Sequence, residues 1–251
     1  MGNCLVTKLK ESVENSSLKK IDEVKLFVVP QLKGAGGNNR LAIESTGEHT
    51  IRVDGNGYFA LSDAELVTNP KTSYTFTGSK DFYFGDNACN VFISNKSSIT
   101  KLYSNGTNLT YKSFVNCDIS ELKFMPALKI IRFPFGPTYG RLSDIPKIGD
   151  NIENFSFGGA PNVKGDLKDL LPLAAGGANT KLKGITLADG NVLTGNYRDL
   201  GPFIGLTDLS VACPGVTGSV EELVAAQISY GRTTSNNLGG YGFGMYITFG
   251  G

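Results

Sequence analysis

The sequence predicts a mainly β protein, in which a small N-terminal β sandwich or barrel is followed by an irregular solenoid of stacked repeats. Three observations lead to this prediction. The 251 residues include 32 glycines and only 19% charged residues, a composition that suits short strands joined by tight turns. Apolar and polar residues alternate through much of the first half. A longer apolar template recurs four times in the second half.

The first 21 residues are expected to form an attachment arm, because they are too few for a core of their own. Residues 1–21 are polar and lack proline, and Val6, Leu9 and Val13 lie at helical spacing. A short amphipathic helix that docks on a partner or on the body of the protein explains this pattern, and a frayed terminus explains it equally well. The candidate assembly contacts in the arm are Leu5, Leu9 and Val13.

Residues 22–97 are expected to form the β domain. Their apolar residues follow a period of two, as in Val24, Leu26 and Val28, which places one face of each strand in a core. Turns rich in glycine and asparagine separate six or seven short strands, as in a small sandwich or barrel. The single histidine, His49, falls in the turn-like stretch STGEHT, and we expect it at the surface.

Four segments within residues 98–230 share one template. Each begins with apolar residues at positions 1, 4 and 6, continues through a glycine, and ends with an acidic residue directly before an apolar one. The apolar triplets are Leu128-Ile131-Phe133, Ile152-Phe155-Phe157, Leu182-Ile185-Leu187 and Leu206-Leu209-Val211. The acidic–apolar pairs are Asp144-Ile145, Asp169-Leu170, Asp199-Leu200 and Glu222-Leu223. Because no unit can bury its own apolar face, we expect the units to stack, with positions 4 and 6 pointing into a shared core.

Exposed strand positions of such an array form the candidate outer binding face, because solenoids usually bind through them. These residues are Lys129, Arg132, Glu153, Ser156, Lys183, Thr186, Asp208 and Ser210. Residues 231–251 end in a glycine-rich aromatic stretch that predicts capping or pairing strands, with Met245, Ile247 and Phe249 as candidate assembly contacts. Since an exposed apolar edge is a pairing hazard, these strands either seal the array or join another copy or partner.

The template resembles leucine-rich repeats, with their strand pattern LxxLxL and a return containing LxG. The clearest examples are LKGITLADGNVLTGNYRDL (182–200) and LTDLSVACPGVTGSVEEL (206–223). The unit lengths are irregular and the signature asparagine is replaced, so the predicted architecture is an irregular leucine-rich-repeat-like solenoid. The stretch SFVNCDISEL (113–122) is similar to the AFxxCxxL phrase of BspA-like repeats, found in surface proteins of Bacteroides. The opening MGNCLVTKLKESVENSSL resembles virion structural proteins of Bacteroides phages, including the crAss-like group, which implies a fibre, decoration or tail-associated component.

Composition argues against a catalytic site, a cofactor and a metal site. The net charge of +1 gives no global field that would attract nucleic acid or a membrane surface, and no apolar run is long enough for a membrane span. Four cysteines stand far apart and His49 is the single histidine, so neither a zinc site nor a hydrolytic triad is expected. We expect the cysteines to be buried, reduced thiols.

The sequence therefore predicts a non-enzymatic structural or attachment component of a multi-copy assembly or homo-oligomer, with other assembly subunits as partners. A phage virion is the expected location, and a leucine-rich-repeat adhesin on the surface of a gut bacterium is the alternative. The lack of a secretory signal favours the virion. A surface glycan or receptor stays open as a partner of the outer face. A glycan-active enzyme is the third hypothesis and would require two facing carboxylates.

Overall fold

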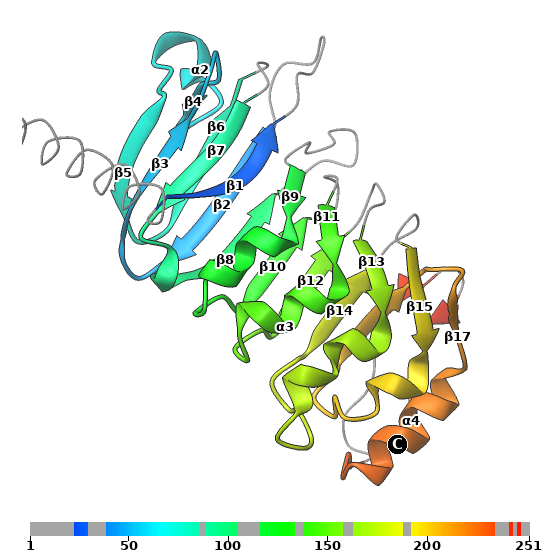
Figure 1. The fold of residues 1–251 in the computed structure, drawn as a ribbon. Coiled ribbons are helices and arrows are strands. Elements are labelled where there is room, and N and C mark those ends of the chain that lie inside the picture. The colour runs from blue at the N-terminus through cyan, green and yellow to red at the C-terminus, as the bar shows by residue number, and fades with distance from the viewer. Residues whose placement is uncertain are drawn as a thin grey trace, which may run out of the picture.

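The strands of the protein form two large sheets, which run the length of the computed structural model (Figure 1). The structure describes residues 23–29, 39–85, 89–104, 116–133, 138–157, 163–187, 192–233, 241–242 and 245–246. The predicted mainly β class is confirmed, and within these residues neither sheet closes into a barrel. The expected arm, with Leu5, Leu9 and Val13, lies outside the described residues.

The first half of the chain supplies antiparallel strands to both sheets. The nine-stranded sheet contains β1 (Glu23–Val29), β7 (Cys89–Ser94), β3 (Glu48–Val53) and β5 (Ser73–Thr77), in this spatial order. The eight-stranded sheet contains β8 (Ile99–Ser104), β2 (Asn39–Ser45), β6 (Lys80–Phe84) and β4 (Phe59–Ala60). Two short helices, α2 (Glu65–Thr68) and η1 (Lys96–Ser98), connect strands. The period-two pattern is seen in β7, where Cys89, Val91 and Ile93 are buried. In β1 the register shifts between Lys25 and Phe27, so the expected alternation of Val24, Leu26 and Val28 is interrupted. Val24 pairs with Ile93, but Phe27 and not Val28 pairs with Val91.

The second half continues the same two sheets with parallel strands. The nine-stranded sheet gains β9 (Asn116–Asp118), β11 (Thr138–Arg141), β13 (Val163–Asp166), β15 (Val192–Asn196) and β17 (Val216–Thr217). The eight-stranded sheet gains β10 (Ile130–Phe133), β12 (Asn154–Phe157), β14 (Gly184–Leu187) and β16 (Asp208–Val211). The return segments are η2 (Ile119–Phe124), η3 (Leu142–Asp144), α3 (Ile145–Ile148), η4 (Leu167–Ala174), η5 (Tyr197–Leu200) and α4 (Val220–Ser229). They lie along one edge of the molecule, below the strands in Figure 1.

One glycine turn recurs in every unit of the template. Its glycines have positive φ angles: Gly140 (+123°), Gly165 (+143°), Gly195 (+117°) and Gly218 (+93°). The backbone N–H after each glycine donates to the acidic residue of the template. The pairs are Arg141–Asp144 (3.1 Å), Asp166–Asp169 (3.0 Å), Asn196–Asp199 (2.9 Å) and Ser219–Glu222 (3.1 Å). The acidic residue therefore accepts from the N-cap amide of η3, η4, η5 and α4. At the last three helices the N-cap side chain accepts in return, which completes a capping box, so the acid has a structural role.

The core is continuous across the expected boundary near residue 97. In the eight-stranded sheet, β8 pairs antiparallel with β2 and parallel with β10, and β1 joins β7 to β9 in the other sheet. One hydrophobic cluster extends from Leu41 in β2 to Leu223 in α4. All twelve triplet residues lie in or against this cluster, and among them only Leu209 is half-buried. The two halves of the chain therefore share their sheets and their core.

His49 is buried, and the expectation of a surface histidine is wrong. The turn before it consists of two residues, so His49 is already the second residue of β3 and is 1% exposed. Its ring packs against Phe76, with 5.4 Å between the ring centroids. Its Nε2 contacts Ser45 Oγ, and its Nδ1 lies 3.2 Å from the Ser94 carbonyl oxygen. His49 and the neighbouring polar residue Ser45 thus belong to a hydrogen-bonded cluster inside the fold.

The cysteines follow the prediction where the structure describes them. Cys89, Cys117 and Cys213 are buried and form no disulfide bond with one another. Burial raises the pKa of the Cys89 thiol to about 11 and that of Cys117 well above its ordinary value. These thiols stay protonated near neutral pH and behave as small core residues.

Candidate functional site

The outer face of the eight-stranded sheet brings most of the predicted binding residues together. Strand register aligns one row of side chains across seven strands: Asp81, Ala42, Tyr103, Arg132, Ser156, Thr186 and Ser210. Because successive side chains point to opposite faces, this row lies opposite the core residues Leu102, Ile131 and Phe155. The row therefore forms a surface that both halves of the chain contribute to.

A second row on the same face runs through Glu44, Lys101, Ile130, Asn154, Gly184 and Asp208. Beside it, Lys129, Glu153 and Lys183 are joined by backbone hydrogen bonds of 2.8 and 2.7 Å. Nζ of Lys129 also lies 3.1 Å from Oε1 of Glu153. Within the described part of the chain, Arg132 and Lys183 form no ion pair.

Seven of the eight residues predicted for the outer face are at least partly exposed. Lys129, Arg132, Lys183 and Asp208 are exposed, and Glu153, Thr186 and Ser210 are half-buried. The prediction is wrong for Ser156, which is buried, with only 6% of its surface exposed. Its short side chain lies between Arg132 and Thr186 of the flanking strands, which leaves little of it accessible.

The assembly contacts predicted near the C-terminus are described only in part. Met245 lies in β19 (Met245–Tyr246), whose backbone pairs antiparallel with β18 (Tyr241–Gly242). This short hairpin approaches β16, at the end of the eight-stranded sheet. Ile247 and Phe249 lie outside the described residues.

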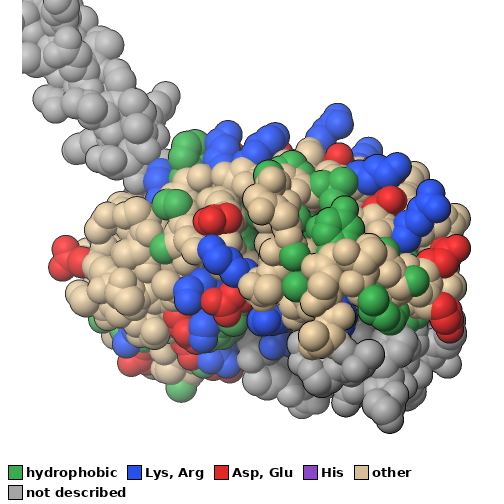
Figure 2. Space-filling model, turned by 90° about the horizontal axis from the view of Figure 1, so that it is seen from below, with side chains coloured by type: hydrophobic (Ala, Val, Ile, Leu, Met, Phe, Trp, Pro, Cys, Tyr) green, Lys and Arg blue, Asp and Glu red, His purple; other side chains and the backbone are tan. Residues whose placement is uncertain are grey.

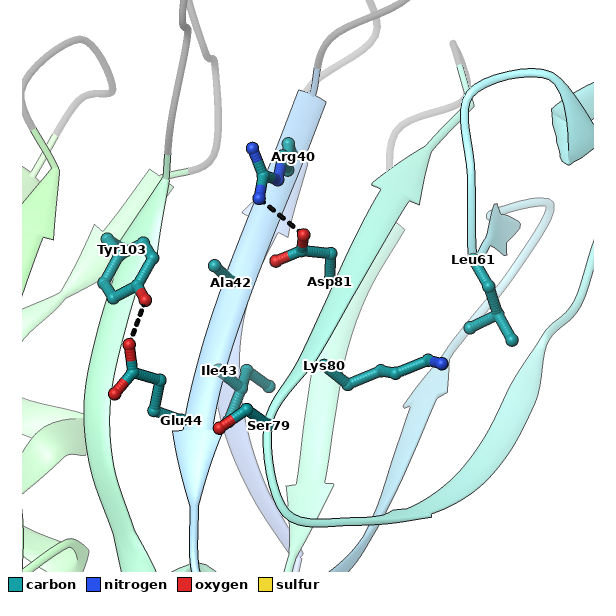
Figure 3. Close-up of a pocket in the computed structure, with 9 residues that line it drawn as sticks. All are labelled: Arg40, Ala42, Ile43, Glu44, Leu61, Ser79, Lys80, Asp81 and Tyr103. Atoms are coloured by element: carbon teal, nitrogen blue, oxygen red, sulfur yellow. Dashed lines mark hydrogen bonds and ion pairs between the residues drawn. The ribbon is translucent and has the colours of Figure 1, made fainter.

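A hollow of about 450 Å³ opens on this face where β6, β2 and β8 lie side by side (Figure 3). Its lining was not predicted, although the alternation in RLAIE (40–44) already marks the outward residues of β2. Ala42 is 3% exposed and stands in the row between Asp81 and Tyr103. A small side chain between two large ones leaves the space. The lining residues are Arg40, Ala42, Ile43, Glu44, Leu61, Ser79, Lys80, Asp81 and Tyr103.

Three of the four charged residues that line the hollow, Arg40, Asp81 and Glu44, are held by hydrogen bonds or ion pairs. A guanidinium nitrogen of Arg40 contacts the carboxylate of Asp81, and the Tyr103 hydroxyl donates to Oε1 of Glu44 (Figure 3). Nζ of Lys101 lies 2.7 Å from Oε2 of Glu44. These hydrogen bonds from Lys101 and Tyr103 hold the pKa of Glu44 below its usual value, while burial and the bond to Glu44 raise the pKa of Tyr103 to about 12. At neutral pH, Glu44 is therefore an ionised acceptor and Tyr103 a neutral donor.

Acidic and basic side chains also adjoin each other on the lower part of the view in Figure 2, which looks at the molecule from below Figure 1. The residues that line the hollow carry two positive charges, on Arg40 and Lys80, and two negative charges, on Glu44 and Asp81. Because charges of both signs lie within the hollow, an ion of either sign would meet a like charge there. The lining also offers several hydrogen-bond donors and acceptors.

In the buried His49 cluster, a histidine nitrogen contacts a serine hydroxyl, as in many hydrolase active sites. The hydrogen bonds of Ser45 nevertheless indicate a structural network. Ser45 is 9% exposed. Its Oγ accepts a hydrogen bond from the Gly47 amide (3.1 Å) and donates to the Ser98 carbonyl oxygen (2.9 Å). The hydroxyl is thus engaged by the Gly47 amide, the Ser98 carbonyl oxygen and His49, all groups of the protein itself.

No protein-family model and no curated protein matches the chain. Across the residues that the structure describes, no three His, Cys, Asp or Glu side chains are grouped so as to hold a metal ion. In the same residues, no helix has the length and apolar character needed to cross a membrane.

Proposed function

We propose that the chain is a non-enzymatic structural or attachment component of a multi-copy assembly, as a fibre, decoration or tail-associated protein of a phage virion. One observation carries the proposal. The recurring acidic residues of the template accept hydrogen bonds from the amides at the starts of the return helices. One outward row crosses seven strands of the eight-stranded sheet, and six of its seven residues carry polar groups, Ala42 being the exception. A broad, pre-ordered face of this kind suits recognition of a large partner.

We also propose that the parallel half is a leucine-rich-repeat-like solenoid and the antiparallel half a β sandwich that caps it. Each complete unit supplies one strand to each sheet and then a return helix, as β12, β13 and η4 do. Neighbouring units pair in constant register, for example Phe155 with Ile185 and Ile185 with Leu209. Stacking of equivalent positions is the arrangement expected of a solenoid.

The free edge of β5 supports the multi-copy part of the proposal. This strand, SYTFT, ends the nine-stranded sheet and carries no charged residue or proline. Among the described residues, no strand pairs with its outer side. Natural monomers usually protect such edges with charges, proline or bulges, because open edges pair with other chains.

Light scattering of the purified protein tests the proposal. We expect an oligomer for the full chain, and a folded monomer either after deletion of residues 1–21 or in the edge variant Thr75→Lys. Thr50→Lys is the matched control, since Thr50 lies beside Thr75 on β3 (Oγ1–Oγ1 2.9 Å) but away from the edge. A monomer in every form would contradict the multi-copy assembly and favour the alternative, a free-standing surface adhesin. Unfolding of the deletion variant would refute the attachment arm.

A further inference from the structure

We propose that the hollow between β6, β2 and β8 is a binding site for a neutral saccharide. The inference rests on the proposed function, because it names the chemistry of the receptor that the outer face would meet. It uses residues of the antiparallel half, which the repeat pattern does not include.

Size and shape are the first argument. The volume of about 450 Å³ lies within the range of small-molecule sites. The floor is Ala42, with Asp81 and Tyr103 rising on its two sides in one row (Figure 3). Because the space exists through the smallness of one side chain, a larger residue at position 42 would fill it.

The balance of charge is the second argument. Two cations, Arg40 and Lys80, face two anions, Glu44 and Asp81. An anionic ligand would lie against the carboxylates of Glu44 and Asp81, and a cationic ligand against the guanidinium of Arg40 and the ammonium of Lys80. Either placement brings like charges together, which costs free energy at a partly desolvated site. A neutral ligand avoids this cost.

Hydrogen-bonding capacity is the third argument. A sugar hydroxyl donates one hydrogen bond and accepts up to two, so neighbouring hydroxyls can bind a carboxylate and a guanidinium at once. Arg40 and Asp81 present such groups as a pair, and Lys80 adds a donor with no ion partner in the described structure. Arg40 and Asp81 already hold each other before a ligand arrives, which limits the entropy lost on binding.

Apolar contact is the fourth argument. One face of a sugar ring carries mainly C–H groups and packs on apolar or aromatic surface. The Tyr103 ring borders the hollow and is held in place by the bond from its hydroxyl to Glu44, while Leu61 supplies aliphatic surface at the opposite side (Figure 3). The site thus combines polar edges with an apolar wall.

Saturation-transfer difference NMR with the methyl glycosides of glucose, galactose, mannose, fucose and N-acetylglucosamine tests the inference. Because a monosaccharide makes few contacts, we expect a dissociation constant on the order of 1 mM for at least one of them. Ala42→Leu should weaken that binding at least about tenfold. Asp81→Asn, which keeps the volume but breaks the charge pair, should also weaken it. Ala225→Leu on the exposed side of α4 is the control and should bind like wild type.

Several results would overturn the inference. They are saturation transfer from none of the glycosides, equal transfer in the folded Ala42→Leu variant, or preferential binding of glucuronate or a polyaspartate peptide. Thermal unfolding of each variant verifies that it is folded. The inference fails separately from the proposed function, because a sugar-binding result does not depend on the oligomeric mass, and loss of the oligomer does not depend on position 42.

Discussion

Replacing Gly165 by alanine should damage the turn that joins β13 to η4. Gly165 has a φ of +143°, a region that L-residues rarely adopt. A Cβ at this position would lie 2.5 Å from Oδ2 of Asp169 and 3.1 Å from Cβ of Leu142 in the preceding unit. Asp169 would have to move, although its carboxylate accepts the hydrogen bond from the Asp166 amide. The substitution therefore strains the backbone and breaks a capping box together.

The expected loss follows from these two effects. The backbone conformation costs about 1–3 kcal/mol for a residue with a side chain, and a lost cap costs about 0.5–2 kcal/mol. Alanine also lowers the conformational entropy of the unfolded chain, which stabilises the folded state by about 0.4–1 kcal/mol. The midpoints of these ranges give a net loss of about 2.5 kcal/mol in the free energy of unfolding.

Urea unfolding followed by circular dichroism measures this loss. Gly176→Ala is the matched control, because a Cβ added at Gly176 would meet no atom within 4 Å and the φ angle there is not in the positive region. We expect the control to stay within about 0.5 kcal/mol of wild type. A Gly165→Ala protein as stable as the control would refute the role assigned to the turn.

Two further predictions concern titratable groups. Hydrogen bonds from Lys101 and Tyr103 lower the pKa of Glu44 in the folded state, so its contribution to stability is present above the ordinary value of 4.5 and is lost as the pH falls through the lowered folded value. The stability difference between wild type and Glu44→Gln in urea should therefore shrink as the pH falls below 4.5. Because burial raises the thiol pKa of Cys89 and Cys117, iodoacetamide at pH ~8 should label both only in denaturant. Labelling of native Cys117, mapped by mass spectrometry, would contradict its burial.

The apolar template predicted much of the core, because buried positions must recur wherever similar units stack. It also marked the acidic residue before each final apolar position, as in Asp169-Leu170, but not the hydrogen bond that the acid makes. That bond depends on the positive φ of Gly165, which composition alone does not reveal. The local pattern therefore indicated the repeating unit and its length. The hydrogen bond in its turn depends on the three-dimensional arrangement of the backbone, which the pattern does not specify.

Two other features, the burial of His49 and the hollow, depend on contacts between residues far apart in sequence, and the sequence did not predict them for that reason. His49 has the neighbours of a turn residue in sequence, yet its partners Ser94 and Ser98 lie more than forty residues away. The hollow depends on Ala42 meeting Asp81 and Tyr103 from two other strands. Sequence alternation identifies which face a residue takes, but it does not identify which strands are neighbours.

The position of β1 in its sheet means that the strands are synthesised in one order and must pair in another. This strand, Glu23–Val29, leaves the ribosome before β7 (Cys89–Ser94) and β9 (Asn116–Asp118), yet it lies between them in the sheet. The backbone N–H and C=O groups of β1 can form their sheet hydrogen bonds only after β7 and β9 have been synthesised. Pairing between strands so far apart in sequence slows folding. A nascent chain that ends before Asp118 thus carries an inner strand of a sheet that it cannot complete. Chaperone contact during translation would be most valuable over this interval.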